Sequence, residues 1–167
     1  MRCIRLVFLA SLVPATAVAS PARPLVSVDI GPALALDGRL GVGGDARGAV
    51  ELPVSGRVSL GLGLEVGAAA WSDVGEMDSG DVVGANVFGK IHVAVQLTPT
   101  LRLEPAVGGG MIHERGDTIR GTLPAYSSTV ALVRDTLRVG VSSHVCIGEL
   151  ESFTPGTQLS LFVGWQS

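Results

Sequence analysis

Three neighbouring side chains could do chemistry together. Ser142, His144 and Cys146 occupy every second position of one short stretch. Alternate residues of a strand project from the same face, so this spacing places a hydroxyl, an imidazole and a thiol side by side. Serine beside histidine is a pairing that nucleophilic enzymes use. The three residues share the polar face of their stretch with Arg138, and we expect them to pack there, with Cys146 as a small buried filler.

Two glycine-rich segments imitate nucleotide-binding motifs. "GANVFGKI", from Gly84 to Ile91, matches a phosphate loop up to its lysine, but Ile91 replaces the hydroxyl residue that holds magnesium. "GVGGDA", from Gly41 to Ala46, resembles a dinucleotide fingerprint, but no helical pattern follows it. A chain with 23 glycines produces such matches by composition. We therefore expect no nucleotide cofactor.

Metal binding has two candidate locations. His92 and His144 would be ligands if they met, but two histidines fall short of the usual ligand set of a zinc site. The acidic segment 72–81, "SDVGEMDSGD", offers carboxylates to calcium without the spacing of an EF-hand. We expect both to serve other roles and the chain to need no metal or other cofactor.

The elements that carry these residues read as strands. Apolar and polar or glycine residues alternate along eight stretches, as in Val58 to Trp71, "VSLGLGLEVGAAAW". The stretch 123–133 is the least regular, because Ser127 and Thr129 interrupt its apolar parity. The eight predicted strands are 26–36, 40–52, 58–71, 83–97, 101–111, 123–133, 137–147 and 157–165.

The connections alternate in length. Short turns at 53–56, 98–100 and 134–136 follow the second, fourth and sixth strands. Longer polar loops at 72–81, 113–120 and 149–156 follow the third, fifth and seventh; the first connection, 37–39, is short. Short turns at one rim and longer loops at the other are typical of membrane barrels.

The N-terminus has the pattern of a secretory signal. Arg2 and Arg5 precede an apolar segment, 6–13, and small residues lead to Ser20. We expect a signal peptide at 1–19 and one domain at 20–167. Without the leader, 10 basic and 15 acidic residues remain, and this net charge of −5 argues against nucleic-acid binding. Cys146 is then the only cysteine, so no intrachain disulfide forms.

The chain resembles the small eight-stranded outer-membrane β-barrel proteins of Gram-negative bacteria. The likeness rests on the leader, the strand count and segments such as "RVSLGLGLEVG" and "LRLEPAVGGGM". It implies an all-β, antiparallel, up-and-down transmembrane barrel in the cell outer membrane, with membrane lipid as its partner. We expect a non-enzymatic monomer. Aromatic residues are only 4% of the chain, so the aromatic girdles expected of such barrels are thin.

In this interpretation the aliphatic faces meet lipid and the polar faces line the lumen. Eight strands enclose a lumen that side chains can fill. Charges of both signs fall on the predicted inner faces, and we expect them to pair, because unpaired charges there would be costly. The predicted lumen network comprises Arg47, Glu51, Arg57, Glu65, Lys90, His92, Arg102, Glu104, Arg138 and His144.

The sequence alone leaves two alternatives open. Alternation alone does not say which face is wet, so a soluble exported barrel with its apolar face inward would bind a small apolar ligand. Some outer-membrane lipid-modifying enzymes are small barrels that use histidine and serine, which gives Ser142 and His144 a possible catalytic role.

The leader gives the first prediction. We expect cleavage after Ala19 or close to it, because Ala17-Val18-Ala19 has the small-residue pattern of a signal peptidase site. N-terminal sequencing of the exported protein should then begin at or near Ser20. An exported protein that retains Met1 would contradict this prediction.

Overall fold

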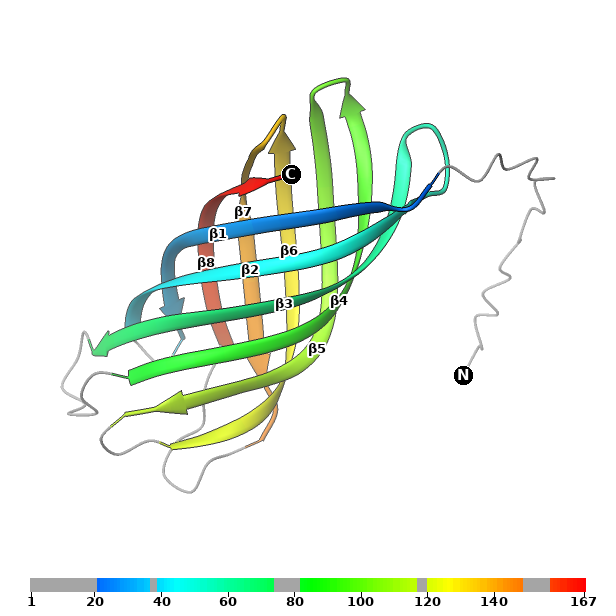
Figure 1. Ribbon diagram of the computed structural model, residues 1–167. Coiled ribbons are helices and arrows are strands. Elements are labelled where there is room, and N and C mark those ends of the chain that lie inside the picture. The colour runs from blue at the N-terminus through cyan, green and yellow to red at the C-terminus, as the bar shows by residue number, and fades with distance from the viewer. Residues whose placement is uncertain (1–20, 37–38, 74–81, 117–119, 149–156) are drawn as a thin grey trace, which may run out of the picture.

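The computed structural model is an all-β closed barrel. It describes residues 21–36, 39–73, 82–116, 120–148 and 157–167. Eight antiparallel strands follow one another around the barrel in chain order (Figure 1). They are β1 (Arg23–Ala35), β2 (Arg39–Pro53), β3 (Val58–Asp73), β4 (Val82–Thr98), β5 (Leu101–Arg115), β6 (Arg120–Arg134), β7 (Leu137–Cys146) and β8 (Thr157–Gln166). Within the described residues no helix is long and apolar enough to cross a membrane.

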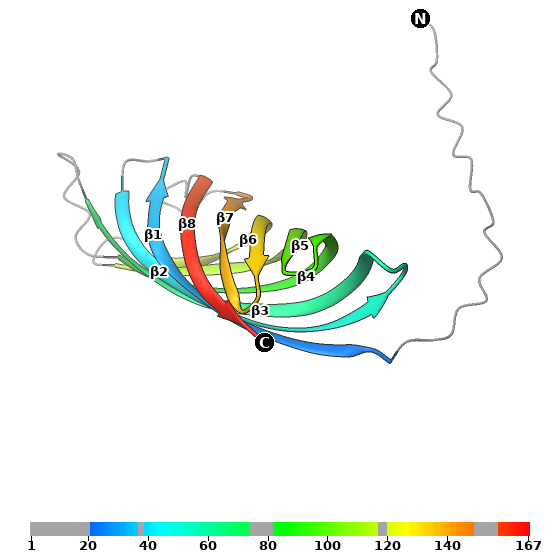
Figure 2. The ribbon, with the colours of Figure 1, turned by 90° about the horizontal axis from the view of Figure 1, so that it is seen from above.

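The first and last strands close the sheet. β1 and β8 pair antiparallel in two segments, from Ser27 opposite Gln166 and from Ala33 opposite Ser160. Figure 2, turned by 90°, shows β1 beside β8 and the strong curvature of the strands. The register pairs of this seam are interrupted at Gly31 and Pro32, and proline has no N–H to donate to a ladder. Closure leaves no strand of the sheet as a free edge.

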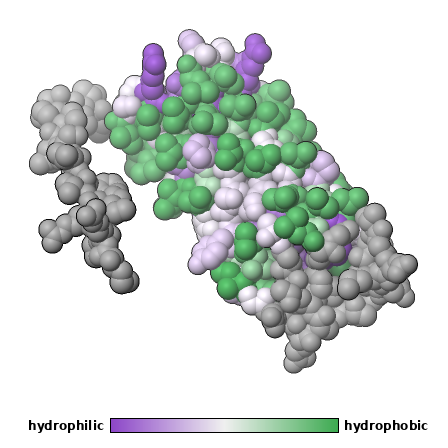
Figure 3. All heavy atoms as spheres, turned by 180° about the vertical axis from the view of Figure 1, so that it is seen from behind, coloured by the Kyte–Doolittle hydropathy of each residue, from purple (hydrophilic) through white to green (hydrophobic). Residues whose placement is uncertain are grey.

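The aliphatic parity faces outward. In β3, Leu60, Leu62 and Leu64 are 46–67% exposed, whereas Glu65 and Trp71 are buried. Figure 3 shows hydrophobic side chains over much of the wall, with hydrophilic ones projecting at one end. A soluble barrel with an apolar interior would need these aliphatic side chains to point inward. The structure places them on the outside, so that alternative is wrong.

The eight predicted strands are confirmed, and their ends differ from the predicted bounds by at most four residues. β5 continues to Arg115 and β6 already begins at Arg120, so residues 113–115 and 120 of the polar segment 113–120 belong to strands. The loops at 74–81 and 149–156 lie outside the described residues.

The structure of β6 explains why the alternation of its sequence is irregular. Its inner face carries the buried Leu123, Ala125, Ala131 and Val133 together with Ser127 and Thr129. The interrupted parity is therefore that of the lumen side, on which apolar and hydroxyl side chains are buried together.

The short turns cluster at one end, which we call the turn rim; the opposite end is the loop rim. The turn between β6 and β7 contains only Asp135 and Thr136. Asp135 has a φ of 55°. Aspartate tolerates this left-handed conformation better than most residues, which suits it to so tight a reversal.

The two native tryptophans test the assignment of the faces. Trp165 is 51% exposed on the outer wall and Trp71 is 2% exposed inside. In vesicles of brominated lipid, we expect strong fluorescence quenching of Trp165 in the Trp71→Phe variant and much weaker quenching of Trp71 in the Trp165→Phe variant. A tryptophan at Val141, with both native ones replaced by Phe, should also be quenched. Equal quenching of Trp71 and Trp165 would reject the assignment.

Candidate functional site

The lumen gathers the polar side chains of all eight strands. Its wall contributes acids, bases, amides and hydroxyls that are at most 6% exposed. The buried polar residues are Ser27, Asp29, Arg39, Arg47, Glu51, Glu65, Lys90, His92, Glu104, Glu114, Ser127, Thr129, Arg138, Ser142, His144, Gln158 and Gln166. Charges so deeply buried must be paired to be tolerated.

Glu104 is the centre of the ion pairs nearest the turn rim. Its fully buried carboxylate accepts from Arg47 Nη2 at 3.0 Å and from Gln166 Nε2 at 2.8 Å. Arg102 forms a further ion pair with Glu104, and Arg138 Nε lies 3.9 Å away. This one carboxylate thus joins side chains from β2, β5, β7 and β8.

Two further acids complete this group. Glu51 accepts from Arg102 Nη1 at 3.0 Å and lies 2.8 Å from His92 Nε2. Asp29 pairs with Arg138, whose guanidinium lies 4.7 Å from the ring centroid of Phe162. The three carboxylates therefore compensate the guanidinium groups of Arg47, Arg102 and Arg138.

A smaller group lies in the middle of the lumen. Lys90 Nζ contacts Glu65 Oε1 at 2.6 Å and donates to Thr129 Oγ1 at 2.9 Å. His144 stacks on Phe88 with ring centroids 4.8 Å apart, and its Nε2 lies 4.0 Å from Glu65. Phe88 is fully buried, and it separates this polar group from the apolar side chains of Ile112 and Ala125.

The third group lies toward the loop rim. Glu114 accepts from Arg39 Nη1 at 3.3 Å and from Gln158 Nε2 at 2.7 Å. The Arg39 guanidinium also lies 5.6 Å from the ring centroid of Trp71. Trp71 in turn packs with Val82 and the small residues of β1, so an apolar layer adjoins this ion pair.

Glycine makes space for these groups on the inner wall. A Cβ at Gly61 would overlap the imidazole of His92, and one at Gly164 would overlap the carboxylate of Asp29. Glycine at these positions therefore allows a charged side chain to lie across the barrel wall.

Nine of the ten residues predicted for the lumen network lie in it. They are Arg47, Glu51, Glu65, Lys90, His92, Arg102, Glu104, Arg138 and His144, of which Arg102 is partly exposed toward the turn rim. Arg57 is the correction. It belongs to the turn between β2 and β3 and is exposed, because the inner face of β3 begins only after it.

Sequence reasoning also missed several members of the network. Arg39 and Glu114 stand at strand ends, within the segments 37–39 and 113–120 that the sequence predicts as connections. Asp29 alternates with apolar residues in β1, a signal that would have identified it. Gln158 and Gln166 are uncharged, so a search for ion pairs overlooks them.

Ser142, His144 and Cys146 lie on the lumen side of β7. Ser142 and His144 are 6% and 5% exposed, and neither Ser142 Oγ nor His144 Nε2 has a hydrogen-bond partner among the described residues. Cys146 is half-buried and packs against Phe88 and its neighbours. The serine and histidine therefore form no hydrogen-bonded pair and face away from the apolar outer wall.

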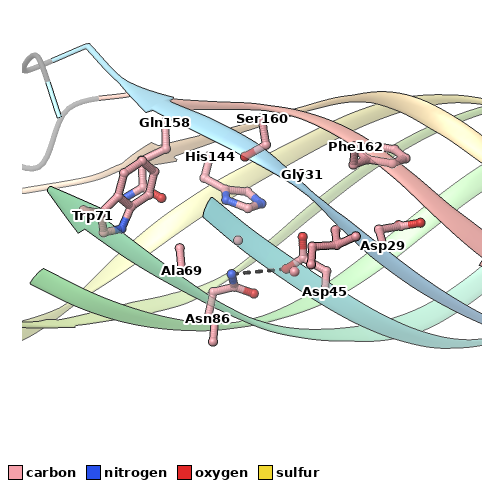
Figure 4. Close-up of a pocket in the computed structure, with 14 residues that line it drawn as sticks. Asp29, Gly31, Asp45, Ala69, Trp71, Asn86, His144, Gln158, Ser160 and Phe162 are labelled. Carbon is pink, nitrogen blue, oxygen red and sulfur yellow. Dashed lines mark hydrogen bonds between the residues drawn. The ribbon is translucent and has the colours of Figure 1, made fainter. Parts of the chain in front are cut away.

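A small cavity remains between the middle and loop-rim groups. Figure 4 shows Asn86 hydrogen-bonded to Asp45, with His144 and Trp71 along the same space. Its volume is about 20 Å³, enough for about one water molecule. Among its lining atoms, Trp71 Nε1, Asn86 Oδ1 and His144 Nε2 have no hydrogen-bond partner in the described part of the chain. The cavity suits a single hydrogen-bonded water.

The described residues contain no group of three or more His, Cys, Asp or Glu side chains placed to hold a metal ion. His92 and His144 join different groups, the first beside Glu51 and the second on Phe88.

Comparisons with known proteins identify the fold. No protein-family model matches the chain, and no curated protein has a significantly similar sequence. The outer membrane enzyme PagL superposes with a TM-score of 0.59 at 10% identity, covering 85% of this chain and 97% of that one. The N-terminal β-barrel domain of Pseudomonas aeruginosa OprF gives 0.50 at 15% identity, covering 88% and 100%. The chain has the fold of small eight-stranded outer-membrane barrels.

Glu104 provides a test of the network. Its replacement by Gln removes the negative charge that Arg47 and Arg102 share and leaves buried cations uncompensated. We expect unfolding in lipid vesicles to become easier by about 3–5 kcal/mol, as measured by urea titration. The exposed Arg57→Gln variant is the control and should change stability by less than about 0.5 kcal/mol. Equal effects of the two substitutions would contradict the network.

Proposed function

We propose that this protein is a non-enzymatic, integral outer-membrane barrel whose lumen is closed by its own side chains. The single observation that carries the proposal is the pairing of an apolar outer wall with a charged interior. Exposed leucine and valine side chains cover the wall, and the buried charges lie within it. In water this distribution would be unfavourable, because the apolar side chains would be hydrated and the charges desolvated. In a bilayer the same distribution is favourable.

The lumen groups support a structural rather than a conducting role. Arg138, Lys90, His92 and Glu104 are at most 1% exposed, and they reach across the interior to partners on other strands. Small eight-stranded barrels have just enough interior volume for such side chains. An ion would have to break these buried pairs in order to pass.

The arrangement of Ser142 and His144 favours a non-enzymatic protein. A lipid substrate approaches from the outer wall, but both side chains point into the lumen and do not bond to each other. PagL, with a similar fold, is an enzyme of the outer membrane, so the fold itself is compatible with catalysis. Support for the proposal therefore comes from the orientation of these two residues and not from the fold.

Two measurements on the same protein test the proposal. Cell fractionation should recover it with the outer membrane, and planar-bilayer recording of the purified barrel should show no stable, large conductance steps. Recovery in the soluble fraction would reject the membrane assignment, and large steps would reject the closed lumen. A change in the lipid A profile on expression that disappears in the Ser142→Ala and His144→Ala variants would instead show an enzyme.

A further inference from the structure

Two arginines stand directly opposite each other on the outer wall at the loop rim. Arg115, the last residue of β5, is the register partner of Arg120, the first residue of β6. Both are exposed, and both have the parity of the lipid-facing Met111 and Tyr126. Like charges directly opposite in an antiparallel pair are destabilising. This pair therefore favours an anion placed between its two guanidinium groups.

The described residues supply no such anion. Neither Arg115 nor Arg120 has an ion-pair partner among them, and the adjacent carboxylate, Glu114, points inward to Arg39 and Gln158. The alternation of the strand thus sends the acid into the lumen and leaves the two bases outside. The ion pairs that neutralise the lumen are not available to this surface.

One position nearer the middle of the wall lies a second polar pair. His113 and Thr122 are register partners, and His113 Nδ1 is 2.8 Å from Thr122 Oγ1. This hydrogen bond uses one ring nitrogen of His113, which fixes the ring on the outer surface. The next register pair that faces outward, one step nearer the middle of the wall, is Met111 and Pro124. This pair is apolar and begins the lipid-facing band. The four residues Arg115, Arg120, His113 and Thr122 form what we call the rim tetrad.

The height of the rim tetrad matches the headgroup layer of a bilayer. On β5 the outward residues from Leu101 to Met111 are apolar or glycine, a length of 11 residues. About 9–11 tilted residues cross the hydrocarbon core, so His113 and Arg115 follow where that core ends. The layer beyond it is roughly 5–8 Å thick on each side and contains lipid phosphates.

We propose that the rim tetrad binds the phosphate of an anionic lipid headgroup at the loop rim. This inference rests on the proposed membrane location. The two guanidinium groups bind the phosphate oxygens with charge-assisted hydrogen bonds, for which arginine is better suited than lysine. The His113–Thr122 pair marks the boundary between this polar site and the acyl chains below it. The ligand neutralises the opposed arginines, so binding also stabilises the β5–β6 hairpin end.

His113 supplies a local reporter. The other histidines of the barrel, His92 and His144, are buried in the lumen, so their ring signals serve as internal references. The wild-type protein is placed in phosphatidylcholine nanodiscs, and the phosphatidic acid fraction is raised while the histidine ring signals are followed by NMR. We expect a saturable shift of the His113 signal and constant His92 and His144 signals.

Matched variants separate this site from general attraction to a charged membrane. The double variant Arg115→Gln, Arg120→Gln should lose the His113 shift. The double variant Arg57→Gln, Arg134→Gln removes the same charge from exposed positions at the turn rim and should keep it. The double variant Arg115→Lys, Arg120→Lys should keep a weaker shift. A shift that survives in the tetrad Gln variant, or that is lost in the turn-rim variant, would overturn the proposal.

Two further measurements identify the source of the phosphate and check the membrane insertion on which the proposal rests. Inorganic phosphate added to pure phosphatidylcholine nanodiscs should leave His113 unchanged; an equal shift would show a site for soluble anions and overturn the lipid assignment. Insertion is verified by quenching of Trp165 with brominated lipid. Insertion with an unresponsive His113 signal would overturn this inference alone, whereas failure to insert would overturn the proposed function together with it.

Discussion

Closure of the sheet is the constraint on which the rest of the structure depends. A backbone N–H or C=O left without a partner in an apolar surrounding costs several kcal/mol, so a sheet whose outer wall is aliphatic must have no edge. β1 and β8 meet this requirement across the length of the molecule, apart from the interruption at Gly31 and Pro32. Once the ring is closed, one face of every strand points into a narrow space and the other points away from it.

The narrow interior then decides which residues occupy it. A ring of eight strands has too little room for large side chains at every inward position, and too little water to hydrate charges. The chain combines glycine at positions such as Gly61 with long side chains such as Arg138, which reach across to Asp29 on another strand. The outcome is a packed polar interior in which Glu104 satisfies several donors at once.

Much of this could be read from the sequence, because alternation reports the face on which a residue lies. It placed Glu65 and Lys90 inside and Val141 outside, as the structure has them. It did not report partners. The neighbours of Glu104 depend on the stagger between strands around the ring, because the stagger sets the position of every side chain along the barrel axis. The sequence of a single strand does not reveal this stagger. Strand ends were also hidden. Arg39 and Glu114 resemble loop residues until their pairing across the lumen is seen.

The sequence separations within the lumen network have a kinetic consequence. Asp29 and Arg138 are 109 positions apart, and Gln166 reaches Glu104 over 62 positions. Structures dominated by such non-local pairings have high contact order and assemble slowly. Here the compensation of buried charge becomes available only when β7 and β8 arrive beside the earlier strands. A nascent barrel lacking them would hold exposed edges together with uncompensated ions, so its partly built forms are unstable and assembly is expected to be strongly cooperative.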